Sequence, residues 1–294
     1  MSDDGDPTEE YRYEKLTWEE VDERAGEETL VVVPVGSTED HGPHLPLDVD
    51  QRIPTAVCER TARDREDTLL FPTVSQGYLP HHMDYPGGVT IGWETFVNHL
   101  IDVGVSLAHH GFRKVLFVNG HGSNHHLVEQ ASRQIVIQYP EVQAAMLSWW
   151  ELEEVREEFR RIRDAGPKGT AHAGELETSV YLHLDPDRVK TEEAPRDVSY
   201  PESRYFNNVD LAGEKPANAS TSVTMTEWWS TTSETGVKGD ASVATAEKGE
   251  RVLAAAVAGL HELLDGFAAY PIREVEDHHS GGRPDRAYDP FRPR

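Results

Sequence analysis

The order of the apolar runs constrains the fold of this chain more than any other feature of its sequence. Short stretches rich in Val, Leu and Phe alternate with longer stretches in which apolar residues recur every three to four positions. The first kind is typical of a buried strand and the second of an amphipathic helix. Strands are expected at residues 30–35, 68–74, 114–118 and 141–149, and the helices between them at 50–63, 93–110 and 123–138.

This alternation predicts βαβ units, in which parallel strands form a sheet and the connecting helices cover both of its faces. The sequence therefore indicates an α/β protein with a mostly parallel central sheet. Further helices are expected from Gly174 and over 241–267, whereas residues 186–235 lose the pattern and predict a long irregular excursion. We assign residues 18–272 to a single domain, with a flexible acidic arm over 1–17 before it and a flexible tail over 273–294 after it.

Charge and composition exclude several classes of protein. The chain has 53 acidic and 28 basic residues, a net charge of -25, which argues against a basic surface for nucleic acid. No stretch approaches the roughly 18 uninterrupted apolar residues of a membrane span, and the acidic first residues do not resemble a secretory signal. The single cysteine, Cys58, cannot form an internal disulfide. We therefore expect a cytoplasmic protein.

The acidic residues are spread over the whole chain, and only seven residues are lysine. Such a composition suits a salty cytosol, where counterions screen the repulsion between carboxylates. The sequence thus favours a halophilic protein of the haloarchaeal type, and an acidic mesophilic protein is the alternative.

Potential metal ligands follow the first and third expected strands. Glu39, His41 and Asp50 come after the first, and His121 comes after the third, between two glycines. In an open parallel sheet the ligand crevice lies beyond these carboxyl ends, and carboxylate with imidazole suits zinc, manganese or iron. Because Glu39 and His41 are two positions apart, extended backbone directs both to the same face, toward one metal or two neighbouring ones. Asp50 could bridge two metals or only cap the following helix.

A third group of chemical interest surrounds His172, just before an expected helix, where an imidazole could act as acid or base. Glu175 and Glu177 fall in the first turn of that helix, where carboxylates also interact favourably with the helix dipole. Other loop chemistries fit less well. The glycines around His121 lack the lysine and spacing of a phosphate-binding loop, and Ser123 lacks the frame of a nucleophile elbow.

Taken in order, these motifs resemble the creatininase family of metal-dependent amidohydrolases. The likeness covers most of the chain. Residues 85–90 resemble the family's Phe-Pro-Gly-Thr turn, with a second glycine in place of the first threonine. The other matching segments are residues 35–46, Asp50 nine positions beyond His41, and residues 119–124, 172–179 and 236–245.

The resemblance implies a three-layer α/β/α sandwich, often assembled as a homo-hexamer, with one or two divalent metals per chain (Zn, Mn or Fe). Carried over by motif, Glu39 and His121 would bind one metal and His41 the other, with Asp50 bridging them. Creatininase proper has a further carboxylate ligand two positions after the histidine that matches His121. This chain has Ser123 there, so either the second metal is weakly held or Glu177 or a water fills the gap, and creatinine itself is disfavoured as the substrate.

The implied activity is hydrolysis of a C–N bond in a small amide, formamide or cyclic amide by a metal-activated water. His172 would protonate the leaving nitrogen, oriented by Glu177. His82 could line the pocket or lie at the surface, and Trp149 and Trp150 could form its aromatic wall or only pack in the core. Three alternatives remain: a formamidopyrimidine deformylase-like step in flavin or deazaflavin biosynthesis, hydrolysis of a ring carbon–carbon or sugar bond by the same metal-bound hydroxide, and a metal-binding protein without catalysis.

Overall fold

The central sheet has the parallel arrangement that the sequence predicts. The computed structural model describes residues 10–166, 168–201, 205, 210–211, 225–276 and 278. Four strands lie in the order β2-β1-β3-β4, and every pairing between them is parallel. Their bounds are β1 (Leu30–Val35), β2 (Thr68–Leu70), β3 (Lys114–Asn119) and β4 (Gln143–Ser148). All residues of β1 and β3 are buried, because helices cover the sheet on both sides.

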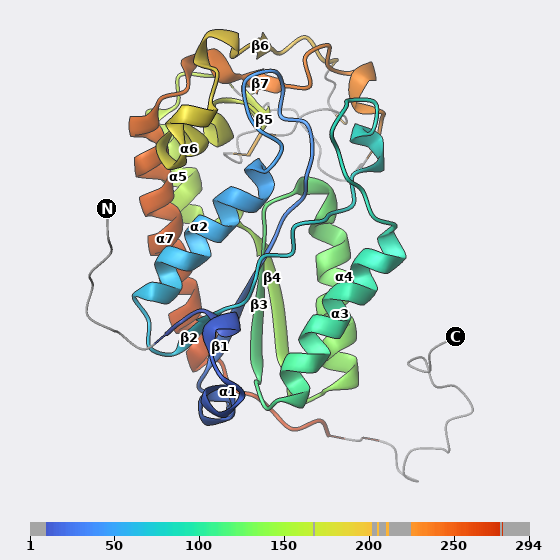
Figure 1. Ribbon diagram of the computed structural model, residues 1–294, viewed down its shortest axis with the longest axis vertical. Coiled ribbons are helices and arrows are strands. Elements are labelled where there is room, and N and C mark those ends of the chain that lie inside the picture. The colour runs from blue at the N-terminus through green and yellow to red at the C-terminus, as the bar shows by residue number, and fades with distance from the viewer. Residues whose placement is uncertain are drawn as a thin grey trace.

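The helices form two layers, one on each face of this sheet (Figure 1). Along β1, Leu30 and Val32 belong to the hydrophobic core on one face, and Val31 and Val33 to the core on the other. The layer on the first face consists of α2 (Val49–Arg63), α5 (Glu153–Ile162), α6 (Glu175–Leu184) and α7 (Ala246–Ala269), and the second of α3 (Trp93–His109) and α4 (His125–Gln138). The predicted α/β/α sandwich is confirmed.

A second, small sheet lies beyond the carboxyl ends of the parallel strands (Figure 1). It consists of β5 (Thr170–His172), β7 (Lys238–Asp240) and β6 (Arg196–Asp197), paired antiparallel in that order. The sequence did not predict this sheet, because none of its strands exceeds three residues or carries an apolar run. It holds the end of the irregular excursion close to the motif at His172.

The two ends of the chain are described in part. Of the expected acidic arm over 1–17, residues 10–17 are described, and there Tyr13 packs its ring against Phe71 and Phe112. Thr17 then caps α1 (Trp18–Arg24). Of the expected tail over 273–294, residues 273–276 and 278 are described, and the rest lies outside the described residues.

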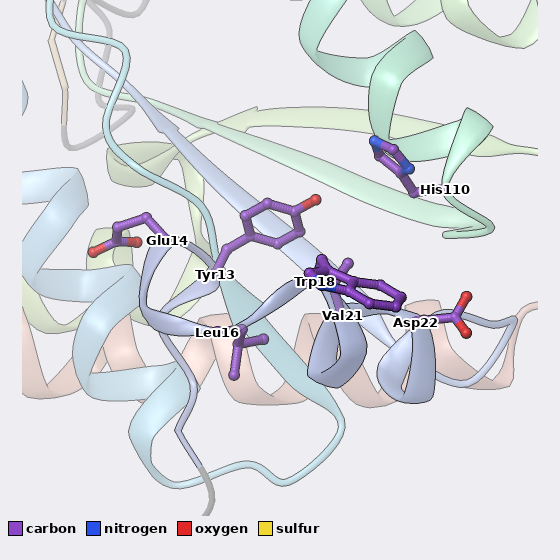
Figure 2. A pocket seen from close by; sticks show the side chains of 7 residues that line it. All are labelled: Tyr13, Glu14, Leu16, Trp18, Val21, Asp22 and His110. Carbon is purple, nitrogen blue, oxygen red and sulfur yellow. The ribbon is translucent and has the colours of Figure 1, made fainter.

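A cavity of about 470 Å³ lies beside α1, at the edge of the sheet where the strands begin (Figure 2). Tyr13, Trp18 and His110 contribute ring side chains to it, and Glu14 and Asp22 contribute carboxylates. None of the groups of potential metal ligands in the described part of the chain lies here. The candidate metal ligands therefore lie at the opposite edge of the sheet.

Helix α7 is long and apolar enough, by composition, to span a membrane. In this fold it packs along α2, α5 and α6, and Val252, Leu253, Leu260 and Leu264 enter the core. The same apolar character therefore serves to cover the sheet. The single cysteine, Cys58 on α2, lies in this core with no exposed surface, and burial raises the pKa of its thiol.

Candidate metal centre and active site

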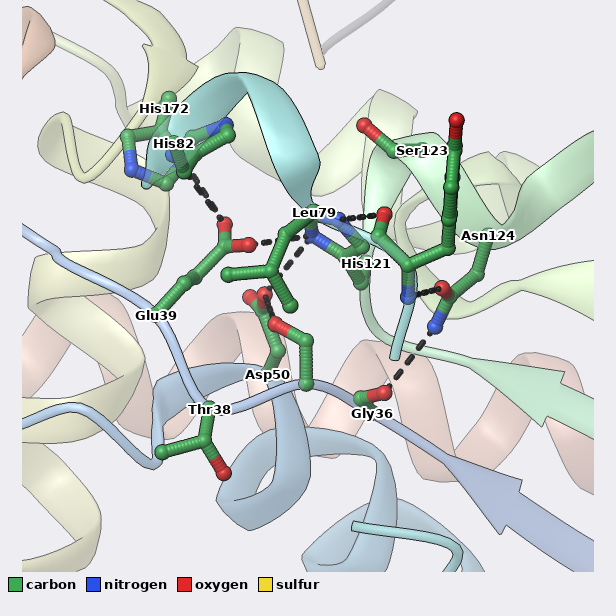
Figure 3. Close-up of polar contacts among 12 residues, drawn as sticks. Gly36, Thr38, Glu39, Asp50, Leu79, His82, His121, Ser123, Asn124 and His172 are labelled. Carbon is green, nitrogen blue, oxygen red and sulfur yellow. Dashed lines mark hydrogen bonds and ion pairs between the residues drawn. The ribbon is translucent and has the colours of Figure 1, made fainter. Parts of the chain in front are cut away.

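The predicted site residues converge where β1 and β3 end. Three overlapping groups of buried side chains have their ligand atoms within 4.8 Å of one another. One group combines Glu39, Asp50 and His121, the second His41, His172 and Glu177, and the third Glu39, His82 and His172. The structure therefore brings together all four predicted metal ligands and both predicted catalytic residues. Figure 3 shows four of them, Glu39, Asp50, His121 and His172.

Asp50 lies at the centre of this arrangement, in the first turn of α2. Its Oδ2 is 3.0 Å from His121 Nδ1 and accepts a hydrogen bond from Ser37 Oγ at 2.8 Å. Its Oδ1 is 3.2 Å from His41 Nε2. Each oxygen thus faces a different histidine, which is the geometry of a bridging carboxylate.

Two glycines allow the strand ends to approach the start of α2. A Cβ on Gly120 would lie 2.1 Å from the backbone oxygen of Asp50, and one on Gly36 would lie 2.5 Å from the same atom. Real Cβ atoms do not come this close to backbone. The glycines before Ser37 and His121 are therefore required for Asp50 to reach both histidines.

Electrostatics in the cluster follow from burial of three carboxylates among imidazoles. Burial raises the pKa of Glu39 to about 7 and that of Glu177 to about 7. Burial alone would lower the pKa of His41 and His121, but Asp50 and Glu39 outweigh it and raise both to about 10. The buried carboxylates thus favour positive charge in the cluster. A divalent cation would supply two positive charges at one point, whereas a protonated histidine supplies one.

The donor atoms fit such a cation. Both carboxylate oxygens of Glu39 and Nε2 of His41 are buried and make no hydrogen bond among the described residues. Their contacts are ion pairs that require charged imidazoles, Glu39 Oε2 to His121 Nδ1 at 3.1 Å and His41 Nε2 to Asp50 Oδ1 at 3.2 Å. Buried polar atoms are rarely left this way unless an ion or water completes them. Mixed carboxylate and imidazole donors suit zinc, manganese or iron, and Asp50 is placed to share two such ions.

His172 and Glu177 face the same cluster from the other side, on β5 and α6. Nε2 of His172 donates to the backbone oxygen of Asp40 at 2.9 Å, which leaves Nδ1 3.8 Å from Glu39 Oε1. Glu177 accepts from the backbone N–H of Ala173 at 2.5 Å, and Ala173 adopts a left-handed φ of 51°. The backbone oxygen of Asp40 thus holds Nε2 of His172, and Glu177 lies in the same ligand group, so its role in orienting His172 stays a prediction.

Glu175 does not belong to the site. Its fully buried carboxylate accepts from the backbone N–H groups of Asp164 and Ala165 and from Lys248 Nζ at 2.5 Å. The contacts tie α6 and α7 to the loop before β5. Glu175 is accordingly a structural residue.

A cavity of about 330 Å³ opens over the cluster. Its wall includes Trp150, whereas the neighbouring Trp149 is buried in the core. His82, which the sequence left undecided, is buried, lines the cavity, and has its Nδ1 3.1 Å from Asp40 Oδ1. The sequence left both tryptophans open between wall and core, and in the structure Trp150 lines the cavity while Trp149 does not.

Trp229 is the site residue that the sequence analysis missed, since it lies in the irregular excursion. Its indole stacks on His82 with ring centroids 4.1 Å apart, and Lys238 Nζ lies 3.8 Å from the ring centroid. Its Nε1 donates to the backbone oxygen of Gly236 at 2.9 Å. The only signal in the sequence is the pair of adjacent tryptophans, Trp228 and Trp229, within an otherwise polar segment.

An α/β/α sandwich with overlapping carboxylate and imidazole groups at its strand ends has the donor set of a metal-dependent enzyme. Comparison with known proteins agrees. The family described as creatinine amidohydrolase matches residues 14–264, and the chain belongs to that family. It is therefore a creatininase-family amidohydrolase, an enzyme that hydrolyses C–N bonds. The expected family is confirmed, and the comparisons do not support its haloarchaeal type.

Relatives of known function span several substrates. The mycofactocin precursor peptide peptidase of Mycobacterium tuberculosis is 36% identical over 242 residues, covering 77% of this chain and 81% of the relative. The creatinine amidohydrolase of Pseudomonas putida is 29% identical over 265 residues, covering 85% and 94%. The 3-dehydro-scyllo-inosose hydrolase of Thermotoga maritima is 32% identical over 180 residues, covering 60% and 56%.

Solved structures agree with the fold. A crystal structure of creatinine amidohydrolase matches with a TM-score of 0.72 at 26% identity, over 90% of this chain and all of the other. A mutant creatininase described as the Zn-Zn type matches with a TM-score of 0.73, and one described as creatininase Mn with 0.70. These neighbours are zinc and manganese metalloenzymes.

Proposed function

We propose that the protein is a divalent-metal amidohydrolase that cleaves a non-peptide C–N bond of a small amide, formamide or cyclic amide. The observation that carries this proposal is the convergence of Glu39, Asp50 and His121 with His41 and Glu177 in one buried cluster under a cavity of about 330 Å³. A cavity of that volume is at the small end of the range for ligand sites. It suits a compact molecule.

The donor set supports two metal positions that share Asp50. Glu39, Asp50 and His121 would hold one ion, and His41, Asp50 and Glu177 the other, with Glu177 in the place that Ser123 does not fill. When bound, a divalent cation lowers the pKa of a coordinated water toward about 7 and polarises a carbonyl oxygen. Zinc, manganese and iron all suit these donors.

We assign proton transfer in this reaction to His172. Because its Nε2–H is engaged by the Asp40 carbonyl, only Nδ1 is available to the reaction, and it faces Glu39 at the cavity floor. Burial and the neighbouring His41 lower the pKa of His172 well below its usual value, so the resting ring is neutral with its lone pair on Nδ1. Nδ1 would take the proton that the attacking water gives up and pass it to the leaving nitrogen as the C–N bond breaks.

A peptide is the second candidate substrate, favoured by the identity of 36% to a peptide peptidase. The two candidates differ in size at the cavity mouth. A peptide would extend beyond the described walls, past Trp229 and Leu211, whereas a small amide would be enclosed by them.

The test combines elemental analysis with turnover. We expect one to two Zn, Mn or Fe per chain, and chelator-sensitive hydrolysis of at least one compound in a panel of creatinine, formamidopyrimidines and short peptide amides. His278→Ala, a change at an exposed residue outside the cluster, serves as the control and should match the wild type. Bound metal without turnover of any amide would instead support a non-catalytic metal-binding protein.

Three further properties are proposed from composition and family resemblance. We propose a cytoplasmic homo-hexamer adapted to a salty cytosol. The net charge of -25 supports the last point, because screening of carboxylate repulsion by KCl stabilises such a surface. A melting temperature that does not change with KCl would contradict the adaptation, and light scattering would measure the assembly.

A further inference from the structure

A polar pair at the edge of the cavity takes no part in the proposed reaction. Ser123 Oγ lies 3.1 Å from His81 Nε2. Ser123 comes from the turn after β3 and lines the cavity, and His81 comes from the turn before the loop that carries Tyr85. Both side chains are half-buried. The pair therefore borders the space that a substrate would occupy.

The pair always has one proton left to donate. A neutral imidazole has one N–H and one lone pair, and a hydroxyl has one O–H. If Ser123 donates to Nε2, the N–H of His81 at Nδ1 is left over; if His81 donates, the hydroxyl proton of Ser123 is left over. Within the described part of the chain, neither side chain has another hydrogen bond. Ser123 lines the cavity and His81 is not among its lining residues, so the donor within reach of a substrate is the Ser123 hydroxyl, left free when His81 donates to it through Nε2.

The surroundings do not provide that acceptor. Figure 3 shows Ser123 on the far side of His121 from Glu39, so the carboxylates of the cluster are turned toward the histidines. The groups that act on His81 by charge are His121 and Lys238 on the positive side and Asp84 and Asp40 on the negative side. Asp40 is engaged with His82, and Asp84 accepts from the backbone N–H of Ser230.

We propose that Ser123 and His81 form a specificity subsite that donates a hydrogen bond to an oxygen acceptor of the substrate. The substrate class is an amide with a second carbonyl or carboxylate group close to the scissile C–N bond. This inference rests on the proposed function, because it defines which amides the same cavity accepts. The pair positions substrate and does not attack it.

Three probes of similar size test the subsite on the zinc-loaded protein. N-Acetylglycine adds a carboxylate to the shared amide, N-acetylglycinamide adds a carbonyl, and N-propylacetamide adds neither. Binding is followed by tryptophan fluorescence, since Trp150 and Trp229 line the cavity. We expect the wild type to bind one of the first two about 3- to 10-fold more tightly than N-propylacetamide, the worth of one hydrogen bond. Which of the two is preferred decides between carboxylate and carbonyl.

Variants separate this role from a structural one. Ser123→Ala should abolish the preference without changing metal content, and Ser123→Thr should restore it because the hydroxyl returns. His81→Gln, which retains a donor, should keep part of it. Ser106→Ala is the matched control, since that hydroxyl bonds only the backbone of α3 at Asp102. For hydrolysed amides, the change should appear in KM rather than kcat.

Several results would overturn the inference. They are equal affinity of the wild type for all three probes, no binding of any probe, or a preference that persists in Ser123→Ala. Failure of the proposed function has a different signature. A zinc-loaded wild type that hydrolyses no amide but still discriminates among the probes would refute the activity and leave the subsite standing.

Discussion

Replacing Glu175 by glutamine tests whether this carboxylate has a structural or a catalytic role. The substitution keeps the shape of the side chain and removes its charge. In the structure the fully buried carboxylate accepts from two backbone N–H groups and from Lys248 Nζ, whose other carboxylate partner, Asp164, is largely exposed. Breaking a buried ion pair from one side costs about 3–5 kcal/mol.

That cost translates into a shift in the melting temperature. With an unfolding entropy of about 2 cal/mol/K per residue, a chain of this length has roughly 0.6 kcal/mol/K, so Glu175→Gln should melt about 5–8 °C lower. Calorimetry of the metal-loaded protein measures the shift, and elemental analysis should show unchanged metal content. Glu250→Gln, at an exposed position on the same helix as Lys248, is the control and should melt like the wild type. A variant with an unchanged melting temperature and no turnover would refute the structural role.

Four further changes probe the site and its support. His121→Ala should lower the metal bound per chain, and elemental analysis showing full content would contradict the assignment of its ligand group. His172→Ala should retain metal but lose about 10²–10⁴-fold in kcat, the range for general acid–base groups; full turnover in a stopped assay would exclude it as the proton carrier. Gly120→Ala should destabilise the fold by about 2 kcal/mol or more, because its Cβ would lie 2.1 Å from the backbone oxygen of Asp50, and urea unfolding at the wild-type midpoint would show that argument to be wrong. Burial lowers the pKa of His44 to about 4, so between pH 6.5 and pH 4 the unfolded chain binds a proton that the folded chain does not. The free energy of unfolding contributed by this residue is fully present above pH 6.5 and falls by up to about 3 kcal/mol toward pH 4. Urea titrations of His44→Asn should show a weaker dependence of stability on pH.

The parallel sheet and its covering helices were predictable because each element carries its own signal. The apolar runs of β1 and β3 are buried on both faces, and α2, α3 and α4 keep their helical spacing to within a residue or two of the predicted bounds. The metal ligands were predictable for a related reason. Since parallel strands end at one edge, polar residues that directly follow two neighbouring strands must meet there.

The parts that escaped prediction depend on contacts between distant segments. The three-residue strands β5 and β7 contain Thr170, His172 and Lys238, and only pairing with strands distant in the sequence, each other and β6, makes them strands. Trp229 is placed by a loop whose hydroxyls at Ser233 and Thr235 bond Asp197, more than thirty positions earlier in the chain. No local pattern can record such a contact.

Adjacent tryptophans show the same limit on a smaller scale. Trp149 and Trp150 follow β4 in one short turn, so their side chains leave in different directions, one into the core and one into the cavity. The sequence shows that two tryptophans are adjacent. The backbone conformation of the turn determines which of the two side chains faces the cavity.

The rate at which the buried thiol of Cys58 is alkylated measures how often the protein opens around it. A reagent that attacks thiolates finds nothing to react with while α2 stays packed on the sheet, because the sulfur has no exposed surface and its ionisation is suppressed. Alkylation therefore requires a motion that exposes Cys58, and its rate measures how often α2 moves away from the core that it covers. Because Asp50 lies in the first turn of the same helix, this rate reports the opening of a segment that supports the metal cluster.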